Sequence, residues 1–164
     1  MTIDVRPYRP ATDEAALWRM KEAFERELGS KTGGADKRET YEAKLDADYR
    51  ARYGSWVDRC LADEPDAITV ATDGAEPVGY VFVLPETLSM IWDAGVLNEI
   101  YVEPSYRGTG VADRLIERAM DVVRSQSLPI DRLVLDVDPD NDRAYEFYRR
   151  HGFDSWGEMV AVEL

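Results

Sequence analysis

Cysteine, histidine and long apolar runs are scarce in this chain of 164 residues. The single cysteine, Cys60, excludes an internal disulfide. One cysteine and one histidine also argue against a zinc centre, so we expect no metal ion. No apolar run approaches the roughly 18 residues that a membrane-spanning helix needs. The first residues lack the apolar stretch of a signal peptide. We therefore expect a cytoplasmic protein without a membrane partner.

Positive charge is also in short supply. Lysine and arginine number 20 against 33 acidic residues, which gives a formal net charge of −13. Nucleic acid is therefore not an expected partner, because phosphate binding needs a basic face. An acidic surface suits a cationic substrate such as an amine, although the same charge also promotes solubility. The length and the apolar share of 45% are typical of one globular domain.

The N-terminal part is expected to combine a strand with a long helix. Alternating apolar and polar residues predict a strand at residues 3–8. Apolar residues then recur at steps of three and four, which predicts a helix capped by Thr12 or Asp13 and ended by Gly29. The recurring residues are Leu17, Met20, Phe24 and Leu28.

Two more helices are expected after a loop at residues 30–34. The first covers about residues 36–52 and is broken at Gly54 and Ser55, and the second ends near Glu64. This helical region is polar and only weakly amphipathic. It either forms a lid over a substrate or covers the sheet.

From Ala67 onward the sequence pattern indicates a sheet. The expected strands are residues 67–71, 78–84, 97–102, 133–137 and 158–163, and the expected helices are residues 110–125 and 141–150. Asp73 and Gly74 predict a hairpin turn between the first two of these strands. No linker divides the chain. The predicted fold is one α/β (α+β) domain with a mixed, largely antiparallel central sheet flanked by helices.

A strand, a turn and a helix start meet at residues 97–112. Gly108 and Gly110 allow a ligand close to the backbone, the helix start offers unpaired N–H groups, and Arg107 carries a planar cation suited to phosphate. Asp113 stands where a dinucleotide fingerprint requires glycine or alanine, and no Gly-Lys-Ser/Thr follows for a Walker A loop. The stretch predicts a pyrophosphate site that belongs to neither nucleotide class.

Two motifs together indicate a family. Residues 107–112 fit the pattern Gln/Arg-x-x-Gly-x-Gly/Ala, and residues 141–153 fit Asn-x-x-Ala-x-x-Phe-Tyr-x-x-x-Gly-Phe. In this order they resemble the GCN5-related N-acetyltransferase superfamily, whose first motif binds the pyrophosphate of acetyl-coenzyme A. The resemblance implies a single N-acetyltransferase domain over residues 1–164. Within it, residues 1–66 form an acceptor or lid region and residues 67–164 the acetyl-CoA-binding core.

The resemblance also implies where acetyl-CoA, the co-substrate, is held. Backbone groups of Ile100 and Val102 would pair with the pantetheine arm, much as a peptide pairs with a strand. Amides from Arg107 to Ala112 would hold the pyrophosphate, and Asn141 would contact the pantetheine side. The implied contacts are Ile100, Tyr101, Val102, Arg107, Gly108, Thr109, Gly110, Val111, Ala112, Asn141 and Tyr148.

Two residues are candidates for proton transfer. Tyr148 is implied as the acid that protonates the departing thiolate, because a phenol pKa of about 10 lies above that of a thiol; its alternative is a core aromatic. Glu99 is the first candidate for the base, with a half-buried acid paired with an arginine as the alternative. Water is an open alternative for the same role, and Asn98, Glu103 and Asp136 are weaker candidates.

The implied reaction is transfer of the acetyl group to a primary amine by direct attack in a ternary complex. The acidic chain favours a small cationic acceptor such as a polyamine. A protein N-terminus or lysine is an alternative acceptor, and a non-catalytic acyl-CoA sensor is an alternative function. A homodimer is also open, because similar proteins are often dimers.

Overall fold

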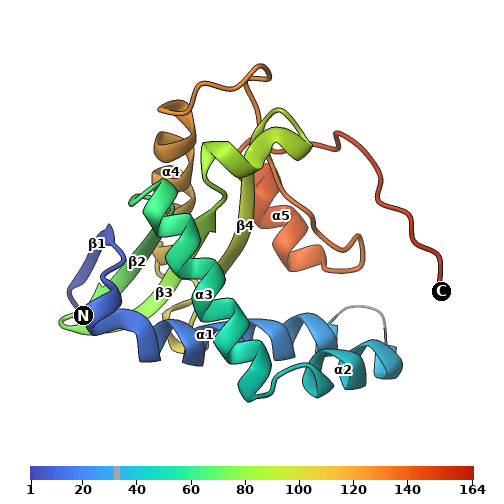
Figure 1. Cartoon of the computed structure of the whole chain (residues 1–164), viewed down its shortest axis with the longest axis horizontal. Helices are drawn as coiled ribbons and strands as arrows, with labels where there is room; N and C mark the ends of the chain where they lie inside the picture. Colours follow the sequence, from blue (N-terminus) through green and yellow to red (C-terminus); the bar gives the residue numbers. More distant parts are fainter. Residues whose placement is uncertain (32–33) are drawn as a thin grey trace.

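The computed structural model describes residues 1–31 and 34–164, and within them one five-stranded sheet forms the centre (Figure 1). The strand order is β1-β2-β3-β4-β5. The first four strands pair antiparallel, and β5 joins β4 in parallel, which confirms a mixed, largely antiparallel sheet. The strands are β1 (Ile3–Pro7), β2 (Ile68–Asp73), β3 (Glu76–Val83), β4 (Gly95–Val102) and β5 (Leu133–Val134).

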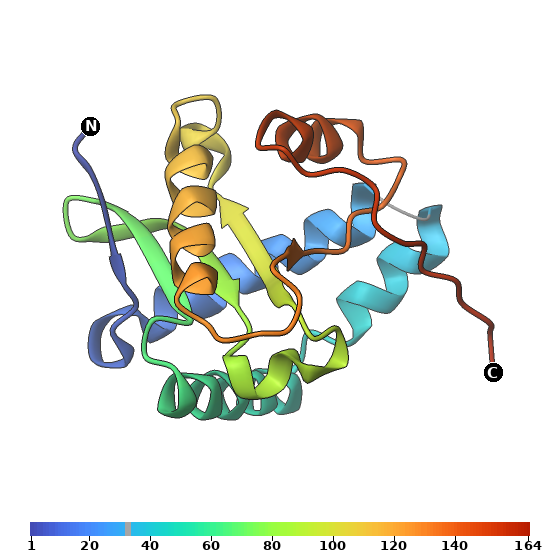
Figure 2. The ribbon, with the colours of Figure 1, turned by 90° about the horizontal axis from the view of Figure 1, so that it is seen from above.

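Helices cover both faces of the sheet (Figure 2). They are α1 (Pro10–Lys31), α2 (Gly34–Ala43), α3 (Ala47–Asp63), α4 (Val111–Arg124) and α5 (Asp142–Arg150). Apolar side chains of α1 and α3 pack on one face, around Tyr80 and Phe82. Side chains of α4 and α5 pack on the other, around Val81 and Val83. We call these the α1 face and the α4 face. No helix among the described residues is long and apolar enough to cross a membrane.

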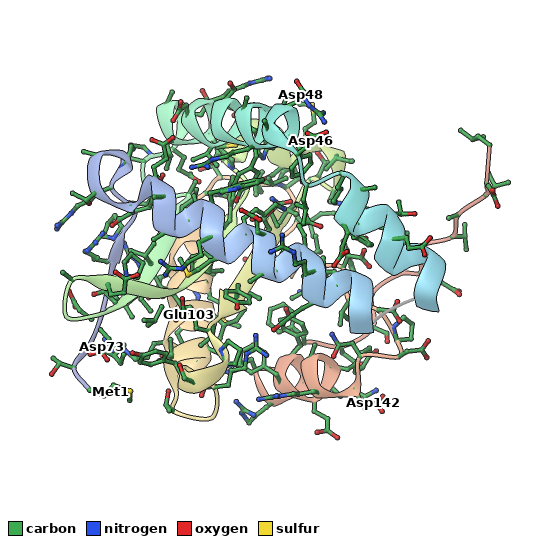
Figure 3. The ribbon with its side chains drawn as sticks, turned by 90° about the horizontal axis from the view of Figure 1, so that it is seen from below. Met1, Asp46, Asp48, Asp73, Glu103 and Asp142 are labelled. Carbon is green, nitrogen blue, oxygen red and sulfur yellow. The ribbon has the colours of Figure 1, made fainter. Side chains whose placement is uncertain are left out.

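The helical region differs from its prediction in how it is divided. The prediction of one continuous helix over residues 36–52 is wrong, because α2 ends at Ala43 and a new helix begins at Ala47. Asp46, labelled in Figure 3, lies at the start of α3. It caps the helix, because its carboxylate accepts a hydrogen bond of 2.8 Å from the Tyr49 N–H. An aspartate that satisfies a free N–H in this way starts a helix, and this signal decides the boundary.

The predicted break at Gly54 and Ser55 is also wrong, because α3 continues through both residues to Asp63. Tyr53 and Val57 on either side are buried in the core, and their packing outweighs the roughly 1 kcal/mol that a glycine costs inside a helix. α1 likewise continues past Gly29 to Lys31. The loop predicted at residues 30–34 lies partly outside the described residues.

The last predicted strand, residues 158–163, is wrong. The segment is extended but pairs with no strand of the described chain, and Met159, Val160 and Val162 are 69%, 84% and 80% exposed. An alternating pattern becomes a strand only where a neighbouring edge accepts its backbone hydrogen bonds. The strand predicted at residues 133–137 is also shorter than expected, since β5 comprises only Leu133–Val134.

Candidate active site

An irregularity in β4 decides which side chains face each layer. Phe82 lies opposite Glu99, but Val83 lies opposite Leu97, so Asn98 is an extra residue at this point of the ladder. Such a bulge reverses the facing of side chains across it. Leu97 therefore belongs to the core of the α4 face, while the Glu99 side chain reaches tyrosines of the α1 face. Beyond the bulge, Ile100 and Val102 pack on the α4 face and Tyr101 on the α1 face.

One edge of β4 is open. β3 pairs along the other edge from Leu97 to Val102. On the open side, β5 pairs only with Gly95 and Val96. The edge of residues 97–102 therefore faces no other strand of the described chain, and its backbone can pair with an extended ligand. The predicted contacts Ile100, Tyr101 and Val102 all lie on this part of β4.

The loop after β4 leads into an uncapped helix start. Gly108 and Gly110 have φ values of 77° and 88°, in the left-handed region that glycine adopts without strain. A Cβ atom added at either glycine would meet no atom within 4 Å, so the space above both is open. Gly110 is the N-cap of α4 and offers no side-chain hydrogen bond. The N–H groups at this helix start are thus available to an anion.

Other loop residues hold this shape. The Thr109 hydroxyl donates a hydrogen bond to the Tyr106 carbonyl. The Val111 side chain is buried in the α4-face core, and Ala112 packs against the same core. What these two residues can present to a ligand is therefore their backbone rather than their side chains.

The Arg107 side chain turns away from the loop. Its Nε donates to the Val102 carbonyl at 2.8 Å, and its guanidinium lies 2.6 Å from Glu27 of α1. The side chain therefore ties the loop to β4 and α1, and its charge already has a carboxylate partner. These two contacts fix the position of the loop relative to β4 and α1.

Asp113, in the first turn of α4, pairs with side chains at the C-terminal end of α5. Its Oδ1 lies 2.7 Å from Arg150 and 2.6 Å from His151 Nε2. The hydrogen bond from Arg150, helped by His151, lowers the pKa of Asp113 despite some burial. This contact offsets the repulsion that a lone carboxylate would exert on a phosphate near the helix start.

Asn141 and Tyr148 lie at the start and near the end of α5. Asn141 is the N-cap, and its Oδ1 accepts a hydrogen bond of 3.3 Å from the Ala144 N–H. Tyr148 packs edge-on against Phe147 and Phe153, with ring centroids 5.3 and 5.6 Å apart. Burial raises the pKa of Tyr148 to about 12. Its hydroxyl makes no hydrogen bond within the described residues, so the phenol keeps its proton and is free to donate it.

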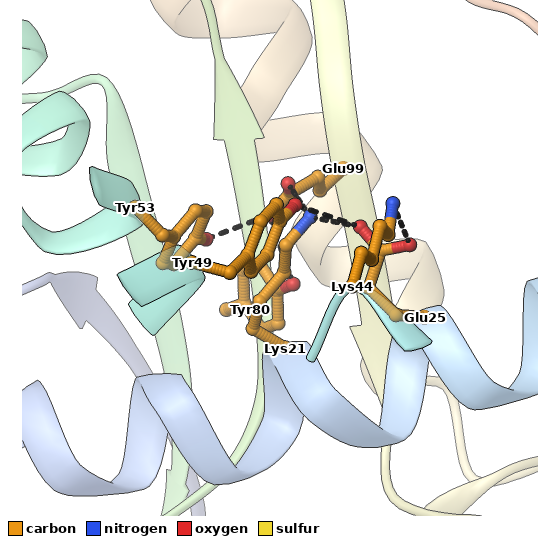
Figure 4. Close-up of polar contacts among 7 residues, drawn as sticks. All are labelled: Lys21, Glu25, Lys44, Tyr49, Tyr53, Tyr80 and Glu99. Carbon is orange, nitrogen blue, oxygen red and sulfur yellow. Dashed lines mark hydrogen bonds and ion pairs between the residues drawn. The ribbon is translucent and has the colours of Figure 1, made fainter. Parts of the chain in front are cut away.

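Glu99 lies in a closed polar cluster on the α1 face (Figure 4). It is 5% exposed. Its Oε1 accepts hydrogen bonds from the Tyr53 and Tyr80 hydroxyls at 2.8 and 3.0 Å. Its Oε2 lies 2.6 Å from Lys21 Nζ. The partner cation is thus a buried lysine of α1 and not the arginine considered from the sequence.

The charges in this cluster hold one another in place. Burial and then the charge of Glu99 raise the pKa values of Tyr53 and Tyr80 well above those of free tyrosine. Burial opposes the charge of Lys21, but Glu99 and Glu25 outweigh it and raise the pKa of Lys21. Both tyrosines therefore act as hydrogen-bond donors, and Lys21 stays a cation.

The structure brings together residues that sequence reasoning did not select, namely Lys21, Glu25, Lys44, Tyr53 and Tyr80. One signal was available: Lys21 lies four residues after Leu17 and Glu25 four after Lys21, so both charges continue the apolar stripe of α1. A charge on a buried stripe indicates a buried partner. The identity of that partner depends on the tertiary fold.

Comparison with known proteins gives a consistent result. The family model described as Acetyltransferase (GNAT) family matches residues 19–153. The chain is 30% identical over 116 residues to an uncharacterized N-acetyltransferase of Methanocaldococcus jannaschii, covering 66% of this chain and 49% of that protein. It is 26% identical over 115 residues to N-alpha-acetyltransferase 30 of Saccharomyces cerevisiae, and the match covers 66% of this chain and 64% of that protein. It is 37% identical over 62 residues to spermidine N(1)-acetyltransferase of Escherichia coli K12, and the match covers 38% of this chain and 33% of that protein. The chain thus spans about half the length of the archaeal relative.

Solved structures share the fold. A GCN5-related N-acetyltransferase from Ralstonia eutropha JMP134 superposes with a TM-score of 0.70 at 22% identity, covering 99% of each chain. PaiA N-acetyltransferase from Thermoplasma acidophilum, solved in complex with coenzyme A, superposes with a TM-score of 0.73 at 16% identity, covering 94% of this chain and 91% of that one. With the family match over residues 19–153, these findings show that the chain belongs to the Acetyltransferase (GNAT) family.

Proposed function

We propose that the chain is an acetyl-CoA-dependent N-acetyltransferase whose acceptor is a primary amine of a small cationic molecule. One observation carries the proposal: the open edge of β4 is joined to the uncapped start of α4 by a short loop, and this loop has two glycines with open space above them. An extended arm that ends in a pyrophosphate fits this combination. Family membership and the coenzyme A complex of the Thermoplasma neighbour support it.

Acetyl-CoA would be held mainly by backbone groups. We assign the pantetheine arm to the edge of Ile100, Tyr101 and Val102, and the pyrophosphate to the amides of residues 108–112. Arg107 would position the loop through its contacts with Val102 and Glu27. The Asn141 amide would contact the pantetheine side while its oxygen caps α5.

Two side chains would move protons, one from each face of the sheet. Acetyl-CoA supplies an activated acyl carbon and a thiolate leaving group. Tyr148, from the α4 face, would donate its proton to that thiolate. Glu99, from the α1 face, would attract the amine and accept its proton. A carboxylate has about four acceptor positions, and Lys21, Tyr53 and Tyr80 occupy three, so one is left for the amine.

The acceptor class rests on charge. The net charge of −13 favours a cationic small molecule. The likeness to spermidine N(1)-acetyltransferase supports the same class. A protein amino group is the second candidate, supported by the likeness to N-alpha-acetyltransferase 30.

A thiol-release assay tests the function. The protein is incubated with acetyl-CoA and a panel of monoamines, polyamines, aminoglycosides and short peptides, while coenzyme A binding is followed by calorimetry. We expect thiol release that depends on a cationic amine. Saturable coenzyme A binding without any amine-dependent release would instead support a sensor domain. Release with peptides alone would support the protein acceptor.

A further inference from the structure

Two lysines contact the same buried carboxylate in different ways (Figure 4). Lys21 Nζ lies 2.5 Å from Glu25 Oε1, and Lys44 Nζ lies 2.8 Å from Glu25 Oε2. The Lys21 side chain is 5% exposed, whereas that of Lys44 is 34% exposed. Lys21 is thus an interior residue of α1, and Lys44, on the connection between α2 and α3, is the one that solvent reaches.

The surroundings of the Lys44 ammonium are those of a recognition site. Besides the carboxylate oxygen, its Nζ lies 4.4 Å from the ring centroid of Tyr41 and 5.3 Å from that of Tyr49. A carboxylate and two aromatic faces around one cation are the features that proteins use to bind ligand ammonium groups. Here a side chain of the protein fills the site.

Glu25 is a buried carboxylate that depends on Lys44 for the partner of one of its oxygens. The residue is 3% exposed, and its Oε2 lies 2.8 Å from Lys44 Nζ. A buried carboxylate oxygen without a hydrogen bond is costly. This oxygen therefore needs a cation beside it, and a ligand ammonium that donates a hydrogen bond there can take the place of Lys44.

The site lies next to the proposed base. Lys21 Nζ contacts Glu25 and Glu99 at once, so the two carboxylates are immediate neighbours. An acceptor that places its reactive amine at Glu99 can place a second ammonium group at Glu25. A monoamine has nothing to place there.

We propose that Glu25, Tyr41 and Tyr49 bind a second ammonium group of the acceptor, and that Lys44 occupies this site until a diamine or polyamine displaces it. The inference rests on the proposed function and narrows its acceptor to molecules with two cationic centres. Lys44 then acts as a built-in competitor and a specificity-determining residue. A monoamine leaves it in place, and a diamine must displace it.

The test compares putrescine with butylamine, which share a carbon chain and differ in the second amine. Lys44→Ala removes the competitor from a partly exposed position. We expect the KM for putrescine to fall at least about threefold, the scale of one lost cation–π and ion-pair competitor, with the KM for butylamine unchanged. Arg26→Ala is the control, because it removes one exposed cation of α1 that pairs with Glu22; it should change neither value.

Glu25→Gln gives the opposite expectation. It removes the charge that the second ammonium would contact, so the KM for putrescine should rise about tenfold or more, and by a larger factor than the KM for butylamine. Because Glu25 also pairs with Lys21, its thermal unfolding is compared with wild type first. If this variant does not fold, the Lys44→Ala variant alone tests the inference. An unchanged or raised KM for putrescine in Lys44→Ala overturns it.

Calorimetry separates this inference from the proposed function. Putrescine is titrated into the coenzyme A-saturated wild type, Lys44→Ala and Arg26→Ala proteins, with no turnover required. Tighter binding only in Lys44→Ala supports the ammonium site even if no amine is acetylated. Acetylation of both amines with parallel changes in every variant keeps the function and refutes the site.

Discussion

Lys21 and Glu99 form an ion pair inside the protein, with 2.6 Å between Nζ and Oε2 and both side chains 5% exposed. The pair joins α1 to β4 at the residue proposed as the base. Burial makes each charge dependent on the other, because neither has water to replace its partner. The geometry of Glu99 is therefore set by α1 as well as by β4.

Lys21→Met should strongly destabilise the fold. The change leaves Glu25 and Glu99 close together without their shared cation, so we expect a loss of about 3–5 kcal/mol in the free energy of unfolding. Urea denaturation at neutral pH measures it. Arg26→Ala, which breaks an exposed pair, should cost no more than about 1 kcal/mol. Equal effects of the two substitutions would show that the buried pair contributes no more than a surface one.

Asp13 should make stability fall in acid. Burial opposes its ionisation, but hydrogen bonds from the Arg6 guanidinium and the Arg9 N–H outweigh burial and lower the pKa of Asp13. A folded-state pKa below the unfolded one gives stability at neutral pH that disappears as pH falls below the ordinary aspartate range of about 4.

Asp13→Asn should therefore lower stability at pH 7 and flatten its decline below pH 5, as measured by urea unfolding across a pH series. An Asp48→Asn control removes a carboxylate that is 80% exposed and should leave the slope unchanged. A variant of Asp13 whose pH profile parallels wild type would show that the Arg6 contact does not stabilise the fold.

The sequence patterns predict the elements that depend on residues close together in the sequence. They miss the features that depend on contacts with residues far away in the sequence. α4 was predicted because its apolar residues recur on one face, and the Gly74 turn because its residue type suits a positive φ. The facing of Glu99 could not be predicted, because strict alternation places it with Leu97, and the bulge at Asn98 separates them. The strand at residues 158–163 failed for lack of an adjacent edge.

The candidate site divides in the same way. Its glycine loop and Asn141 cap are local features: Gly108 and Gly110 have the positive φ angles that glycine adopts without strain, and Asn141 is the N-cap of α5. The ammonium site depends on contacts of Glu25 with Lys44 and of Lys44 with Tyr49, across two helices and a connection. No periodic pattern encodes such contacts, because they depend on how the helices pack.

Tyr148→Phe should slow turnover without weakening cofactor binding. The hydroxyl group is the only difference between the two side chains, so we expect kcat to fall about 100-fold, the typical scale of a general acid. The Kd for coenzyme A should stay unchanged in calorimetry. Because burial raises the pKa of Tyr148 to about 12, wild-type kcat should show no loss from tyrosine ionisation up to pH 10. Wild-type turnover in the variant would refute the assignment.

Gly110→Asp tests the loop against a matched change elsewhere. Gly110 and Gly74 both have positive φ, 88° and 60°, and a Cβ at either meets no atom within 4 Å. Aspartate at each position should therefore impose a similar strain of about 1 kcal/mol on the fold. Only at Gly110 does the new carboxylate stand at the start of α4, where it would repel a pyrophosphate and fill its space. We expect calorimetry to give a Kd for coenzyme A at least about 100-fold weaker for Gly110→Asp and an unchanged Kd for Gly74→Asp. Equal affinity in the two variants would place the pyrophosphate away from this loop.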